Sequence, residues 1–103
     1  KENLKPWYDQ IIAGIKKFGN DVEFSNKKAY VSIRRKKQFA LIQPSTKTRL
    51  DVGLNIKGVT PSGIAEAGSS WNAMCTHRIK VDDEKTINND LVNWIKLAYD
   101  QAG

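Results

Sequence analysis

The chain has 103 residues, 40% of them apolar, and a formal net charge of +6. This length predicts one domain with a single hydrophobic core, and it leaves no room for a separate catalytic domain. No stretch approaches the roughly 18 consecutive apolar residues of a membrane span, so we expect no membrane partner.

The first residues and the number of cysteines indicate in which cellular compartment the protein is expected. Residues 1–4 lack the apolar run of a signal peptide, and Cys75 is the only cysteine, so the chain cannot form an internal disulfide. We therefore expect a cytoplasmic protein. Because the chain starts on Lys rather than Met, we expect residues 1–103 to be a single α+β domain from the C-terminal part of a longer protein.

An amphipathic helix is predicted over residues 4–18, where apolar side chains recur at a spacing of three and four. Asn3 is expected to cap its start, Pro6 fits its first turn, and the Gly-Asn pair at 19–20 supplies a left-handed stop. A short strand is predicted over 21–25.

A hairpin is predicted next. Apolar and polar residues alternate over 29–34, and the run 39–42 is apolar at every position. A four-residue loop between the two runs sets their antiparallel register. The expected pairs are Val31 with Ile42, Ser32 with Leu41, Ile33 with Ala40, and Arg34 with Phe39.

A further strand is predicted over 49–56, where apolar residues alternate strictly with others. A turn at 45–47 would pair Leu50 with Ile42 on the core side of the sheet. The outward side would then carry basic, polar and apolar residues, namely Tyr30, Arg34, Phe39, Leu41, Gln43, Arg49, Asp51, Gly53 and Asn55.

Residues 57–75 contain three glycines and show no clear periodicity, so we expect a long loop, a kind of segment that often has a binding role. A last strand is predicted over 77–81. A closing helix, marked by apolar residues between 87 and 99, follows it. The cap of this helix is expected at Asp82, Asp83 or Thr86.

The resulting order of one helix, five strands and one helix predicts the α+β class. Each predicted helix has a single apolar stripe, and the predicted sheet has one apolar face that these stripes can cover. We therefore expect a two-layer sandwich, with the N- and C-terminal helices packed on one face of a five-stranded antiparallel sheet.

Five short motifs are similar to a known family, namely Gly19–Glu23, Lys28–Ser32, Lys37–Ala40, Gln43–Pro44 and Arg49–Leu54. On these motifs the chain resembles a bacterial family of domains of unknown function, number 5655, over nearly its whole length. The resemblance implies that a small helical domain precedes this one. It implies no activity, substrate or catalytic residue.

The order of elements is also similar to that of frataxins, which bind iron through an acidic first helix and a neighbouring strand. The first predicted helix here has Asp9 as its only acid, beside Lys5, Lys16 and Lys17. The resemblance therefore does not extend to the residues that bind iron.

The positive charge is concentrated in one segment, since eight of the 17 Lys and Arg residues lie in residues 27–50, which contain no acid. Lys and Arg neutralise phosphates, and exposed aromatic rings can stack on bases. We therefore predict a nucleic-acid or other polyanion-binding surface made by Tyr30, Arg34, Arg35, Lys36, Lys37, Phe39 and Arg49. The alternative is a solvated hairpin loop whose charge protects a sheet edge from aggregation.

A second hypothesis places a protein partner or a small acidic ligand in a groove between the outward face and the 57–75 loop. Its residues would be Asp51, Asn55, Trp71, Asn72 and His77. Asp51 is otherwise expected to pair with Arg49 or another basic neighbour across the sheet.

A third hypothesis is a hydrolase that uses Cys75 and His77, which point to the same face if both lie in one strand. The alternative is a buried structural cysteine beside a partly exposed histidine. One cysteine and one histidine fall two ligands short of a closed zinc site, and the glycines match no phosphate-binding fingerprint. We therefore predict a non-catalytic binding module with no metal and no cofactor.

Overall fold

The computed structural model describes residues 4–69 and 71–103. It confirms the α+β class, with two α-helices, an antiparallel sheet and a short 3-10 helix, η1. The elements are α1 (Lys5–Lys16), β1 (Glu23–Asn26), β2 (Val31–Arg34), β3 (Gln38–Thr46), β4 (Arg49–Leu54), β5 (Ala65–Ala67), β6 (His77–Val81), η1 (Glu84–Thr86) and α2 (Asn89–Ala102).

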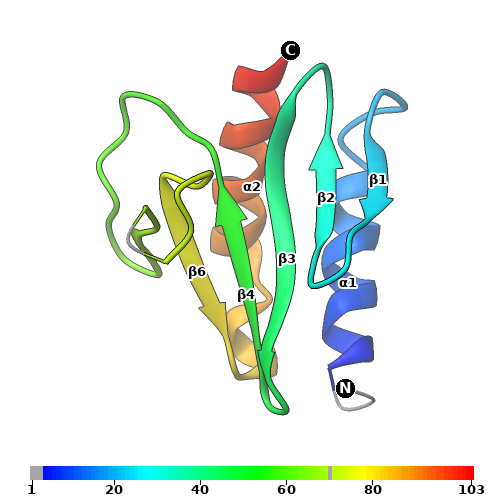
Figure 1. Ribbon diagram of the computed structural model, residues 1–103, viewed down its shortest axis with the longest axis vertical. Helices are drawn as coiled ribbons and strands as arrows, with labels where there is room; N and C mark the ends of the chain where they lie inside the picture. Colours follow the sequence, from blue (N-terminus) through cyan, green and yellow to red (C-terminus); the bar gives the residue numbers. More distant parts are fainter. Residues whose placement is uncertain (1–3, 70) are drawn as a thin grey trace.

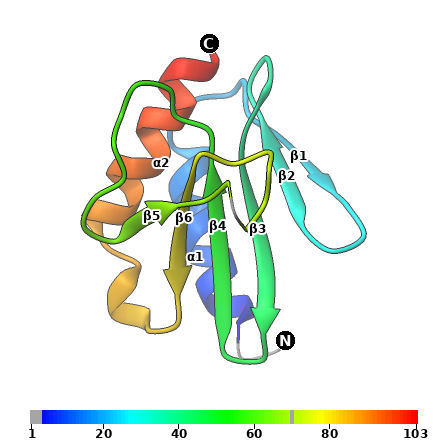
Figure 2. The ribbon, with the colours of Figure 1, turned by 60° about the vertical axis from the view of Figure 1, so that its left-hand side comes forward.

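The sheet has six strands, not the five predicted, in the order β1-β2-β3-β4-β6-β5. The additional strand is β5, which pairs antiparallel with β6 and lies within the segment predicted as a loop (Figure 2). A strand of three residues is too short to show an alternating pattern. The periodicity of the sequence therefore could not reveal it.

The predicted register of the β2–β3 hairpin is confirmed at three pairs and wrong at the fourth. Ile33 lies opposite Ala40 as expected, but a bulge follows, and Arg34 pairs with Gln38 instead of Phe39. Phe39 is the extra, unpaired residue of this bulge. Its side chain points into the core, where it is 1% exposed and its ring centre lies 5.8 Å from that of Tyr99. Burial of the large apolar ring accounts for this departure from regular pairing.

The β3–β4 register also differs from the prediction. Leu50 pairs with Pro44 rather than with Ile42, because β3 runs on to Thr46 and leaves only a short turn before β4. A shift of two residues keeps every side chain on its expected face of the sheet. The core side chains of β4 were therefore predicted correctly despite the wrong partners.

Both helices have the single buried stripe that the spacing predicts. Ile11 and Ile15 of α1, and Leu91 and Ile95 of α2, join the sheet's apolar side chains in one cluster. The predicted cap Asn3 lies outside the described residues. The cap of α2 is Asn88, whose side chain accepts a hydrogen bond from the Leu91 N–H.

The predicted caps Asp82, Asp83 and Thr86 are therefore wrong for α2. Asp83 caps η1 instead, where its carboxylate accepts a hydrogen bond from the Lys85 N–H. In Figure 1 both helices lie behind the sheet, so the face turned toward the viewer is not covered by a helix. This side, which carries no helix of the described residues, is the outer face of the sheet.

Candidate functional site

The outer face follows from the register, because side chains alternate between the two sides of each strand. One row across four strands consists of Leu41, Gly53, Arg78 and Glu66. A second row places Asp51 between Gln43 and Lys80. The face is therefore mainly polar and carries both signs of charge.

Asp51 is a fully buried carboxylate at the centre of this face, with 0% of its surface exposed. Arg78 Nη2 donates to Asp51 Oδ2 at 2.9 Å, and the Ser45 hydroxyl donates to the same oxygen. Arg49 Nε lies 3.4 Å from Asp51 Oδ1. Two guanidinium groups thus compensate one buried negative charge, as a buried ion requires.

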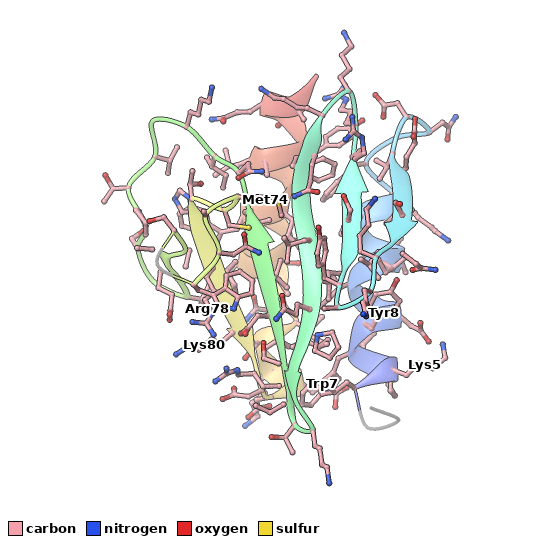
Figure 3. All side chains as sticks on the ribbon, viewed as in Figure 1. Lys5, Trp7, Tyr8, Met74, Arg78 and Lys80 are labelled. Atoms are coloured by element: carbon pink, nitrogen blue, oxygen red, sulfur yellow. The ribbon has the colours of Figure 1, made fainter. Side chains whose placement is uncertain are left out.

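The ion cluster continues to the sheet edge. Arg78 Nη1 lies 3.9 Å and Lys80 Nζ 3.7 Å from Glu66 Oε1. The guanidinium of Arg78 also lies 4.8 Å from the centre of the Trp71 ring. Three cations therefore face two carboxylates, and Figure 3 shows Arg78 and Lys80 along β6 on the outer side of the sheet.

The loop before β6 covers part of the outer face. A Cβ atom on Gly53 would overlap the Cys75 sulfur and lie 3.1 Å from the Trp71 ring and 3.2 Å from Leu41. Glycine is thus required where the loop approaches β4. Met74 of this loop is 48% exposed and projects over the sheet (Figure 3).

In the basic hairpin, Arg35 has a structural role. Its Nε donates to Asp21 Oδ2 at 2.7 Å, its Nη1 donates to the Tyr99 carbonyl at 3.0 Å, and its guanidinium lies 4.0 Å from the Tyr99 ring centre. The hydrogen bonds from Arg35 and Tyr99 hold the pKa of Asp21 below its usual value. Lys36 and Lys37, at the hairpin tip, are exposed.

The eight cations of residues 27–50 lie at two ends of the sheet, because successive antiparallel turns point in opposite directions (Figure 1). Arg34 to Lys37 lie at the β2–β3 turn. The other four, Lys27, Lys28, Lys47 and Arg49, lie at or beside the two turns at the opposite end. The length of β3 from Gln38 to Thr46 separates the groups by about 26 Å.

The aromatic residues predicted to accompany these cations are not on the outer face. Phe39 is in the core, so the expectation that it faces outward beside Arg34 is wrong. Tyr30 lies half-buried just before β2, and its carbonyl accepts a hydrogen bond from the Lys27 N–H. Neither ring is placed to stack on a ligand at the hairpin tip.

The residues of the second hypothesis do not share one groove. Asp51 is on the outer face, whereas His77 pairs with Leu54 and packs 5.4 Å from Trp94 on the helix side of the sheet. Asn55 and Asn72 bond to nearby backbone. The Asn55 side-chain amide donates to the Gln38 carbonyl, and Asn72 Oδ1 accepts from the Met74 N–H.

Cys75 and His77 do not form a catalytic pair. Cys75 lies against Gly53 on the outer side, while the ring of His77 lies on the core side and bonds to Thr76 Oγ1 through Nδ1. Burial raises the pKa of the Cys75 thiol to about 11, which disfavours the thiolate nucleophile. His77 is buried rather than partly exposed.

Comparison with models of protein families shows to which family this chain belongs. A model described as domain of unknown function (DUF5655) matches residues 1–102. The chain belongs to this family. Searches among curated proteins and among solved structures gave no match. The description of this family names no activity.

Two further observations concern the described part of the chain. Over residues 4–69 and 71–103, no group of three His, Cys, Asp or Glu side chains could hold a metal ion. No helix in the same ranges is long and apolar enough to cross a membrane.

The cluster around Asp51 was found only in part from the sequence. Pairing of Asp51 with Arg49 was expected and is confirmed, but Arg78, Glu66 and Ser45 were missed. The alternation of β6 could have identified Arg78 as outward-facing, since Ile79 and Val81 point inward. Glu66 lies on a strand that the pattern did not reveal.

Proposed function

We propose that this domain binds nucleic acid through the phosphate backbone, along the outer face and the β2–β3 hairpin. The observation that supports the proposal is the arrangement of positive charge. Cations stand at both ends of a sheet face that no helix of residues 4–69 and 71–103 covers, and Arg78 and Lys80 lie along β6 on the same face.

The separation of the two cation groups favours an extended ligand. A small anion cannot contact groups about 26 Å apart. One strand of a nucleic acid carries a phosphate about every 3.4 Å along the duplex axis, so roughly eight phosphates span this distance. A phosphate chain is therefore the class of ligand that can use both ends of the face.

The ion cluster contributes fixed guanidinium groups to this face. Asp51 is fully buried and accepts from Arg78 Nη2. Arg78 Nε is itself buried, so only the remaining Nη N–H groups are left for Glu66 or a ligand. Arg49 and Lys80 are 29% and 43% exposed in their side chains. The two side chains are therefore partly accessible from solvent, although Arg49 Nε itself is buried.

The proposed binding is independent of base sequence. Phe39 is in the core, and the ring of Trp71 is covered by the guanidinium of Arg78, so the proposal includes no base stacking. Contacts to phosphates position a nucleic acid but do not read its sequence.

The proposal is tested with two double charge reversals. K36E/K37E changes the hairpin tip, and K16E/K17E makes the same change of residue type and net charge at the end of α1, in the helix layer. Binding to labelled oligonucleotides of about 16 nucleotides, single- and double-stranded, is measured by fluorescence anisotropy at low salt.

We expect K36E/K37E to weaken binding by at least about tenfold, and K16E/K17E to change it by less than about threefold. Equal losses in the two variants would show that only net charge matters and would overturn the assignment to this face. No binding by the unchanged domain to either oligonucleotide would overturn the proposed function itself.

A further inference from the structure

A hollow of about 650 Å³ lies between the first turns of α1 and the β1–β2 turn. It is at the opposite end of the sheet from the β2–β3 hairpin tip. Figure 3 shows Tyr8 of α1 beside this turn. The volume lies within the range of roughly 300 to 1,000 Å³ that small-molecule sites occupy.

The lining of the hollow is largely apolar. Leu4, Ile42 and Leu50 contribute side chains that are each 3% exposed or less. The rings of Tyr8 and Tyr30, both half-buried, complete the walls. These residues come from α1, from the β1–β2 turn and from two central strands, so the fold itself forms the hollow.

The rim of the hollow is positively charged. Lys27 and Lys28 are exposed, and no described acidic side chain lies within 4.0 Å of either ammonium group in the ion pairs of residues 4–69 and 71–103. Lys5 also borders the hollow, but its ammonium is 3.0 Å from Asp9 Oδ2. Lys27 and Lys28 are therefore the cations available to a ligand.

We propose that this hollow binds a small amphipathic carboxylate, with its apolar chain or ring against Leu4, Ile42 and Leu50 and its carboxylate at Lys27 and Lys28. An apolar cavity with a few polar groups at one side fixes the orientation of such a ligand. Tyr8 and Tyr30, which also line the hollow, each have a hydroxyl group that can donate a hydrogen bond. The site shares Lys27 and Lys28 with the cation group at this end of the sheet but does not involve Lys36 and Lys37, so K36E/K37E affects the proposed nucleic-acid function without changing this hollow.

Two probes of equal chain length and opposite charge test the proposal. Octanoate and octylammonium are titrated separately into the ¹⁵N-labelled domain, and amide resonances are followed by NMR. We expect octanoate to saturate one site in the millimolar range and to shift the amides of residues 26–31 and of Lys5, Trp7 and Tyr8. Octylammonium should produce no saturable shift there, since its charge is repelled by the rim.

Charge-reversal variants distinguish a specific contribution of Lys27 and Lys28 from an effect of the net charge of the domain. K27E/K28E should weaken octanoate binding by at least about tenfold, and K16E/K17E should leave it within about twofold. The proposal fails if octanoate causes no saturable shift at these amides, if both probes bind equally, or if the two variants weaken binding to the same extent.

Discussion

At the scale of single residues, the buried carboxylate of Asp51 is the feature with the largest energetic consequence. Asp51 has no exposure to water and accepts hydrogen bonds from Arg78 and Ser45, which are themselves only partly exposed. Loss of one partner from a buried ion pair leaves the opposite charge uncompensated and costs about 3–5 kcal/mol. The guanidinium of Arg78 would then face only Glu66 across a longer distance.

Asp51→Ala is therefore expected to lower the free energy of unfolding by about 3 kcal/mol. Urea denaturation followed by circular dichroism measures this change. Glu66→Ala is the control, because Glu66 is half-exposed and its ion pairs are longer; it should cost less than about 1 kcal/mol. Equal effects of the two substitutions would contradict the central role of Asp51.

The buried thiol of Cys75 is expected to make the stability of the domain depend on pH. Burial raises its pKa from 9.0 to about 11, so the folded state holds the proton more tightly than the unfolded state does. The associated stability is fully present below pH 9 and is lost as the pH rises toward 11.

Cys75→Ala removes this titration. Between pH 9 and pH 11, the unchanged domain should lose about 2 kcal/mol more of its unfolding free energy than the variant does. Urea denaturation at several pH values measures both slopes. Parallel slopes in the two proteins would show that the thiol has an ordinary pKa in the folded state.

At the scale of elements, the contacts among Arg35, Asp21 and Tyr99, called the Arg35 clamp, join three parts of the chain. Arg35 follows β2, Asp21 precedes β1, and Tyr99 belongs to α2. The Tyr99 hydroxyl donates to Asp21 Oδ1 at 2.8 Å, so one carboxylate connects the hairpin to the closing helix. The pairing depends on the ionised form of Asp21.

The lowered pKa of Asp21 gives this clamp a definite dependence on pH. The carboxylate is ionised more readily in the folded state, so its stabilising effect is present above its ordinary pKa of 3.8 and is lost as the pH falls below that value. Asp21→Asn should therefore lose less stability between pH 5 and pH 2.5 than the unchanged domain. Thermal unfolding across this range compares the two proteins, and identical losses would contradict the clamp.

The β2–β3 hairpin shows which strand pairs the apolar periodicity of the sequence predicts and which it does not. The strand patterns gave the correct partners Ile33 and Ala40 because both must be buried on the same face. They did not give the bulge after Ile33, since the burial of Phe39 depends on Tyr99, which is 60 residues away in the sequence. Regular alternation represents local backbone geometry and contains no information about such a distant contact.

At the scale of the whole molecule, the positive charges are arranged differently in space than along the sequence. Eight cations that are neighbours in the sequence divide between two ends of the sheet, because each antiparallel turn reverses direction. The turns themselves could be predicted, so this division was accessible from the sequence. The contribution of Arg78 was harder to foresee, since it depends on β4 and β6 lying side by side.

The proposed nucleic-acid binding depends most directly on phosphate contacts by these cations. If about four of them contact phosphates of a DNA duplex, the logarithm of the binding constant should fall with the logarithm of salt concentration with a slope of about −3.6. Removal of two contacts in K36E/K37E should reduce the magnitude of this slope by about 1.8, while K16E/K17E should leave it unchanged.

The most direct test of phosphate-backbone binding measures this slope by fluorescence anisotropy for the unchanged domain and both variants. We expect a steep slope that K36E/K37E alone reduces, with a fourfold rise in salt weakening binding of the unchanged domain by about two orders of magnitude. A flat salt response, or the same slope in all three proteins, would contradict it.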